Sequence, residues 1–201
     1  MLDYKLNPEK TALVFIDCQY DFINEALGTP EAIIALDNVV NLATAPVTYM
    51  CATQDTHNDT YLTTREGQRL PVPHTIAGEH GWQIADPLRN ILDNHDTHTT
   101  RKFQKETFGS NDLVTYLTNL VQNQDINTII FCGFCTDICV ISNVLATQLA
   151  TNNTIDIVVV QDACAGVTPE KHLAALNVMN SCQIDIATTE NILTALTQDE
   201  E

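Results

Sequence analysis

The feature that most constrains the fold is an alternation of short apolar runs with helix-periodic segments along the chain. The first apolar run, Thr11–Asp17, is rich in Val, Ile and Phe, which is typical of a strand buried on both faces. Six strands alternating with helices predict a three-layer α/β/α sandwich around a six-stranded, mostly parallel, doubly wound sheet. The predicted strands are 11–17, 47–53, 99–104, 126–134, 155–162 and 183–187, and the predicted helices are 30–45, 85–93, 111–122, 136–150, 169–182 and 190–197.

The pattern also predicts how the chain is divided. No repeat, low-complexity run or linker interrupts the 201 residues, so we expect residues 1–201 to form a single domain. Residues 54–82 form a long polar segment with Pro and Gly but little periodicity. Loops of that length in compact domains are usually functional.

Charge and cysteine content exclude several classes of partner. Nine Lys and Arg against 26 Asp and Glu give a net charge of −17, which disfavours nucleic acids and anionic membranes as ligands. The seven cysteines are an odd number, and no apolar run is long enough to span a bilayer. We therefore expect a cytoplasmic enzyme with free thiols, and we expect it to form a homo-oligomer.

Residues that could take part in a chemical reaction follow the apolar strands. Parallel sheets place their active sites at the carboxyl ends of the strands. Asp17 ends the first predicted strand, where a carboxylate is costly unless it is paired, caps a segment or is functional. Cys139 lies where the fourth strand turns into a helix, and the positive end of a helix lowers a thiol pKa. The residues alone leave open whether Cys139 is a nucleophile or a small buried apolar residue.

A second group of residues suits a metal ion. Asp55 and His57 follow the second predicted strand, and His74 and Glu66 lie in the long polar segment. Two imidazoles and a carboxylate bind zinc while leaving positions open, and Glu66 is a candidate fourth ligand, directly or through water. We expect zinc, with iron or manganese as alternatives. A zinc site built from the cysteines at 132, 135 and 139 is disfavoured, because no second thiol pair lies nearby.

Five motifs, in order and spacing, resemble those of the isochorismatase-like cysteine hydrolases: VFIDCQYDF, TQDTH, LPVPHTIAGEHGW, KETFGSNDL and GFCTDICVISN. The resemblance runs from about Ala12 to Ile186. The later stretch DACAGVTPEKHLAALNVMNSCQI is similar to a nicotinamidase-related subgroup. The resemblance therefore implies an isochorismatase-like fold and a hydrolytic activity.

The resemblance implies an Asp–Lys–Cys triad with Asp17 as acid and base and Cys139 as nucleophile. Two registers compete for the lysine: the KETFGS pattern selects Lys105, and the spacing found in many relatives selects Lys102. We choose Lys105. The family also implies a cis peptide between Phe134 and Cys135 that directs backbone N–H groups toward an oxyanion.

In nicotinamidases the matching Asp, His and His positions hold a metal that binds the pyridine nitrogen, which assigns Asp55, His57 and His74 to this role. Phe22 matches a residue that packs against the substrate ring. Pro71 stands where nicotinamidases usually carry an aromatic residue on the other side of that ring.

We therefore expect an amidase that cleaves a small, nicotinamide-like carboxamide to the acid and ammonia through a thioester on Cys139. Two alternatives remain at this point. One is a hydrolase of the same fold acting on a ureido or carbamoyl compound, and the other is an idle relative that serves as a binding module.

Overall fold

The computed structural model describes residues 5–197 and contains one six-stranded sheet in which every strand pairing is parallel. The strand order is β3-β2-β1-β4-β5-β6. A doubly wound α/β sheet was expected, and this topology confirms it. The strands are β1 Thr11–Ile16, β2 Tyr49–Asp55, β3 Thr100–Lys105, β4 Thr128–Phe134, β5 Asp156–Ala165 and β6 Asp185–Ala187.

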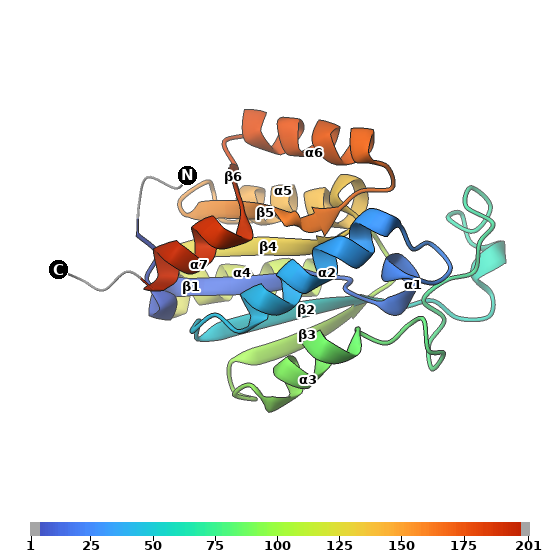
Figure 1. The fold of residues 1–201 in the computed structure, drawn as a ribbon, viewed down its shortest axis with the longest axis horizontal. Coiled ribbons are helices and arrows are strands. Elements are labelled where there is room, and N and C mark those ends of the chain that lie inside the picture. The colour runs from blue at the N-terminus through green and yellow to red at the C-terminus, as the bar shows by residue number, and fades with distance from the viewer. Residues whose placement is uncertain (1–4, 198–201) are drawn as a thin grey trace.

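Helices cover both faces of the sheet (Figure 1). On one face, α2 contacts α3 and α7, and on the other, α5 contacts α4 and α6. Three of the helices begin at a Ser or Thr whose side-chain oxygen accepts a backbone N–H, as N-cap residues do. The helices are α1 Tyr20–Ile23, α2 Pro30–Ala43, α3 Asp86–Asn94, α4 Asn111–Asn123, α5 Ile141–Ala150, α6 Pro169–Ser181 and α7 Thr189–Thr197.

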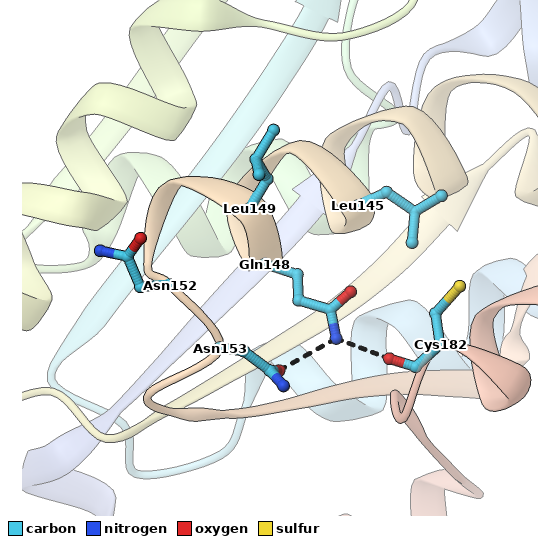
Figure 2. Close-up of a pocket in the computed structure, with 6 residues that line it drawn as sticks. All are labelled: Leu145, Gln148, Leu149, Asn152, Asn153 and Cys182. Atoms are coloured by element: carbon cyan, nitrogen blue, oxygen red, sulfur yellow. Dashed lines mark hydrogen bonds between the residues drawn. The ribbon is translucent and has the colours of Figure 1, made fainter.

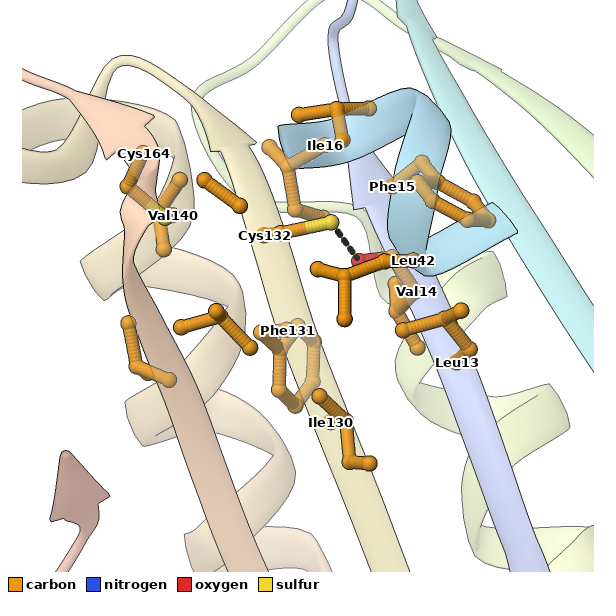
Figure 3. Packing of buried hydrophobic residues seen from close by; sticks show 14 of the residues in the cluster. Leu13, Val14, Phe15, Ile16, Leu42, Ile130, Phe131, Cys132, Val140 and Cys164 are labelled. Atoms are coloured by element: carbon orange, nitrogen blue, oxygen red, sulfur yellow. Dashed lines mark hydrogen bonds between the residues drawn. The ribbon is translucent and has the colours of Figure 1, made fainter. Parts of the chain in front are cut away.

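The apolar core lies along the central strands β1 and β4. Every residue of these two strands is buried, as expected for a parallel sheet covered on both faces. Figure 3 shows Phe131 and Ile130 of β4 beside Leu13 and Val14 of β1, with Leu42 of α2 packed over them. The uninterrupted apolar runs in the sequence are therefore the interior of the sheet.

Several predicted boundaries shift by about two residues, and two local features were not predicted. β2 runs to Asp55 rather than ending at residue 53, and β5 continues past a register shift to Ala165 rather than ending at residue 162. The helix expected from residue 136 begins as a π-helical turn, Thr136–Val140, and α5 starts only at Ile141. The short helix α1 has no clear periodicity in the sequence.

The strand order places a topological switch point between β1 and β4, because the chain adds strands on one side of β1 first and then on the other. The segments that follow β1 and β4 carry Asp17 and Cys139, and β2 and β3 end at Asp55 and Lys105. The fold thus brings four widely separated residues of the predicted site to one edge of the sheet.

Candidate active site

Asp17 is the first residue beyond β1 and is completely buried. Its backbone is left-handed, with φ at 46°, which turns the chain away from the strand direction. The backbone N–H of Asp17 donates to Thr53 Oγ1 at 3.0 Å, and that hydroxyl donates to Asp17 Oδ1 at 2.6 Å. Thr53 on the neighbouring strand β2 thus fixes both the backbone and the carboxylate.

Lys105, the last residue of β3, lies at the centre of the site. Its Nζ is 2.7 Å from Asp17 Oδ2, 3.2 Å from Asp55 Oδ1 and 3.7 Å from Cys139 Sγ. Lys105 is the residue that pairs with Asp55 in the β2–β3 register. Lys102 is exposed and pairs with Asp93, on the opposite face of the strand from Lys105.

Cys139 lies in the π-helical turn that follows β4. The peptide bond between Phe134 and Cys135 is cis, as the family resemblance implied. The side chain of Asn143 donates to the carbonyl of Cys139 at 2.8 Å, and its Oδ1 accepts the N–H of Ser110 at 2.9 Å. Single-turn π-helices are frequent at functional sites.

Burial changes the protonation of these groups. Burial raises the pKa of the Cys139 thiol well above its usual value, and the charge of Asp17 acts in the same direction, while Lys105 opposes them. The expected lowering of this pKa by the helix start is therefore wrong, because desolvation outweighs it. Burial also raises the pKa of Asp17, with Lys105 lowering it and Asp55 raising it. Burial thus favours the neutral thiol of Cys139 over the thiolate.

Lys105 stays charged despite its burial. Desolvation lowers its pKa, but the negative charges of Asp17, Cys139 and Asp55 more than reverse this effect, and the net pKa shift is upward. Burial likewise raises the pKa of Asp55, and contacts with His57 and Lys105 reverse this to give a pKa of about 2. The site therefore holds a buried ammonium between two carboxyl groups.

Asp55, His57 and His74 are buried and form a compact group beside Lys105, in which one ligand atom from each lies within 4.8 Å of the others. Asp55 Oδ2 is 3.1 Å from His57 Nε2 and 3.6 Å from His74 Nε2. Glu66 Oε1 is 4.0 Å from His57 Nε2 and 3.7 Å from His74 Nε2. Glu66 therefore approaches the group without belonging to its closest set.

The side chains of this group fit a divalent metal ion. His57 Nε2 is buried and has no hydrogen-bond partner among the described residues, although Asp55 is near. His74 Nδ1 lies 2.8 Å from the carbonyl of Val72, which leaves Nε2 as the ligand nitrogen when Nδ1 carries the proton. An unpartnered imidazole nitrogen facing a carboxylate oxygen suits zinc-type coordination.

Aromatic rings surround the histidines. Phe22 is buried and its ring packs edge-on to His74 with centroids 5.7 Å apart. The sequence did not indicate Tyr61, which is almost completely buried and contacts both His57 and His74 at centroid distances of 4.7 and 4.9 Å. Pro71 is exposed. Phe22 is thus close enough to the candidate metal group to contact a ligand there.

Two other polar residues of the site were missed from the sequence. Gln19 donates to the carbonyl of Asp55 and accepts its N–H, both at 2.8 Å, and so holds the end of β2. Thr53 lies two residues before Asp55, so strand alternation places both side chains on one face and could have indicated it.

The surface hollow shown in Figure 2 is a different place. It has a volume of about 470 Å³, and in it Gln148 donates to Asn153 Oδ1 and to the carbonyl of Cys182. No Asp, Glu, Lys, Arg or His lines it. The hollow lies against α5, away from the strand ends that carry the site, and its exposed Cys182 thiol has no charged side chain beside it among the described lining residues.

A buried acid, a lysine and a thiol lie in contact at the switch point of a parallel sheet, next to side chains that could hold a metal ion, and this arrangement suits a hydrolytic reaction. Comparison with protein families specifies it further. The isochorismatase domain matches residues 11–191, and the chain therefore belongs to the isochorismatase family of hydrolases.

Individual proteins agree with this assignment. An uncharacterized isochorismatase family protein, PncA of Bacillus subtilis (strain 168), is 28% identical over 175 residues, which cover 84% of this chain and 93% of the relative. The crystal structure of nicotinamidase PncA from Bacillus subtilis has a TM-score of 0.71 at 29% identity, covering 89% of this chain and 99% of that one.

A pyrazinamidase/nicotinamidase structure from Streptococcus mutans UA159 has a TM-score of 0.67 at 27% identity, covering 88% of this chain and 99% of that one.

In the part of this chain that the structure describes, no helix is both long and apolar enough to cross a membrane.

Proposed function

We propose that the protein is an amidase that hydrolyses a small, nicotinamide-like carboxamide to the carboxylic acid and ammonia. The observation that carries the proposal is the position of Lys105 Nζ, 2.7 Å from Asp17 and 3.7 Å from Cys139. This contact set joins a base, a cation and a nucleophile in one buried site. Relatives at 29% and 27% identity are named nicotinamidases, which supports the amide substrate.

In the first half-reaction, Asp17 takes the proton of the Cys139 thiol, and the thiolate attacks the amide carbon. Because burial disfavours the thiolate, the carboxylate of Asp17 is needed to accept this proton. The tetrahedral intermediate expels ammonia, which receives the proton from Asp17. Lys105 remains charged and stabilises the negative charge that moves between Asp17 and Cys139.

In the second half-reaction, Asp17 takes a proton from water, and the resulting nucleophile attacks the thioester carbon. The C–S bond of the thioester breaks, the carboxylic acid leaves, and Asp17 returns the proton to the Cys139 sulfur, which restores the thiol. In both halves the oxyanion accepts hydrogen bonds from the backbone N–H groups of Cys135 and Cys139. The cis peptide before Cys135 belongs to the same turn.

Asp55, His57 and His74 would hold a divalent ion, with zinc as the first expectation and iron or manganese as alternatives. When bound, the ion would act as a Lewis acid that orients the substrate, for example by binding a ring nitrogen. Glu66, whose Oε1 is 3.7 Å from His74 Nε2, would be the fourth ligand, directly or through water. Phe22 packs against the substrate ring.

The proposal is tested by measuring ammonia release across a panel of nicotinamide, pyrazinamide, aliphatic amides and ureido compounds, with and without a chelator. Wild-type enzyme should release ammonia from the two aromatic amides, and Cys139→Ala should release none. Cys182→Ala is the matched control, because Cys182 is an exposed thiol away from the site. His57→Ala should lose the metal as well as activity.

Activity that survives in Cys139→Ala would refute the nucleophile. Full activity in a metal-free wild-type enzyme would refute the metal. Pro71, in place of an aromatic residue, favours substrates that need less ring contact. If only the ureido or aliphatic compounds are cleaved, the protein is a cysteine hydrolase acting on another C–N bond and the nicotinamide assignment fails.

A further inference from the structure

Asp21 is a buried carboxylate that the proposed chemistry does not use. It lies in α1, is only 8% exposed, and its Oδ2 accepts the backbone N–H of Thr75 at 2.6 Å. Its Oδ1 accepts the N–H of Ala26 at 3.3 Å. Gly81 gives the carboxylate its space, since a Cβ at that position would lie 2.3 Å from Asp21 Cγ. The carboxylate is therefore enclosed, and it binds the backbone amide of a residue 54 positions further along the chain.

Thr75, the main partner of Asp21, has an unusual backbone. It is completely buried with φ at 47°, a left-handed conformation that is an outlier for a β-branched residue. Such conformations persist only where the surroundings determine them, and they cluster at functional sites. At Thr75 the hydrogen bond to Asp21 is one of those determinants.

Each polar group of Thr75 is engaged, and two of them contact the candidate metal ligands. Its Oγ1 donates to Asp55 Oδ2 at 2.9 Å, and its carbonyl accepts the N–H of His57 at 2.9 Å. His74, the third ligand, directly precedes it in sequence. One strained residue is thus connected to all three members of the group.

We propose that Asp21 is a positioning residue of the metal site and acts through Thr75. The Asp21 carboxylate holds the Thr75 N–H, which fixes the left-handed turn and aims the Thr75 hydroxyl at Asp55 and the imidazole of His74 at the ion. This inference rests on the proposed metal site. Partners of metal ligands orient them, and losing such a partner typically costs ten- to a hundredfold in metal affinity.

The test measures Co²⁺ binding to the full-length, metal-stripped protein by competition with a chromogenic chelator, together with the visible spectrum of the Co²⁺ form. Asp21→Ala removes the acceptor of the Thr75 N–H and should weaken Co²⁺ binding by about ten- to a hundredfold and alter the spectrum, which reports ligand geometry. Asp86→Ala, which removes an exposed carboxylate at the start of α3, should match wild type.

Thr75 provides a matched pair of variants. Thr75→Val keeps the branched shape but removes the hydroxyl, and should also weaken Co²⁺ binding. Thr75→Ser keeps the hydroxyl and should stay within about threefold of wild type. If Asp21→Ala does not fold, Gly81→Ala displaces the same carboxylate by steric contact and should lower Co²⁺ affinity in its place.

A merely structural role for Asp21 would lower the melting temperature of the metal-free protein and leave Co²⁺ affinity and spectrum unchanged in the folded variant. That result would overturn the inference while the metal site stands. Wild-type protein that binds no Co²⁺ or Zn²⁺ would instead remove the metal site itself. The two failures are therefore distinguishable.

Discussion

The middle of the sheet and its carboxyl edge are built on opposite physical principles. In the middle, the strands β1 and β4 are fully buried and, apart from a Thr at the start of each, apolar or Gly. At the edge, an equally buried region holds the charges of Asp17, Asp55 and Lys105, a cis peptide, a π-helical turn and left-handed residues such as Thr75. Within a few residues, the chain thus changes from an apolar strand to a group of buried polar side chains.

The difference teaches that burial serves two purposes in this protein. In the middle, burial removes apolar surface from water and so stabilises the fold. At the edge, burial raises the pKa of Cys139 and Asp17 and strengthens the interactions of Lys105 with both. Changes in the middle should therefore lower stability, and changes at the edge should lower activity.

The largest expected effect is on stability. Phe131→Ala removes a fully buried ring from the middle of β4 and should lower the free energy of unfolding by about 3–5 kcal/mol. The activity of the protein that remains folded should be within about threefold of wild type. Urea unfolding measures the first quantity, and Leu149→Ala, at a side chain 81% exposed, is the control that should change little. Lost activity in fully folded Phe131→Ala would contradict the claim that the middle of the sheet serves stability and not activity.

The next effect is on activity at the edge. Lys105→Ala should lower kcat by at least about a hundredfold, a typical loss for a group that stabilises developing charge. Lys102→Ala should be mild, because Lys102 is exposed and paired with Asp93 away from the site. Steady-state kinetics of the two folded variants separate the registers. The reverse ranking would show that Lys102 carries the charge.

The fold was largely predictable, and the lysine shows where sequence reasoning stops. The alternation of apolar runs and helices allows only a small number of sheet topologies, and the doubly wound sheet is the default among them. Choosing between Lys102 and Lys105 required the strand register. Asp55 of β2 pairs with Lys105 of β3. Side chains alternate between the two faces of a strand, so Lys102, three residues before Lys105, lies on the opposite face.

The remaining features depend on contacts between distant segments. The left-handed backbone of Asp17 is fixed by a hydroxyl on β2, and that of Thr75 by a carboxylate on α1. Local propensity gives no sign of either. The pKa of Cys139 likewise follows burial, which tertiary packing decides, and so the prediction from the helix start alone was wrong.

A smaller effect concerns the substrate ring. Pro71→Trp should lower KM for nicotinamide by about threefold to tenfold, because an aromatic contact contributes about 0.5–1.5 kcal/mol beyond its buried area. Pro71→Leu is the control for added apolar bulk without a flat ring. Michaelis–Menten analysis with ammonia detection provides the measurement. An unchanged KM in Pro71→Trp would show that this position does not face the ring.

The smallest effect is a shift in pH dependence. Asp17 must be ionised to act as the base, so kcat/KM falls as pH falls through its pKa. Burial is the largest influence on the pKa of Asp17 and raises it, whereas the hydrogen bond from Thr53 lowers it. Thr53→Val removes that bond, so the pKa rises further and the acid limb should move to higher pH. Thr147→Val, at another buried Thr, should leave the limb in place. A shift toward lower pH would contradict this assignment of the base.

The most direct test of the central claim, that Cys139 at the carboxyl edge forms the thioester, is mass spectrometry of enzyme quenched with acid during turnover of nicotinamide. Acid preserves the thioester, and peptide mapping locates the added acyl group. The account predicts a nicotinoyl group on the peptide that contains Cys139, and none in Cys139→Ala. Ammonia release at the wild-type rate in Cys139→Ala, or an acyl group on a different cysteine, would contradict it.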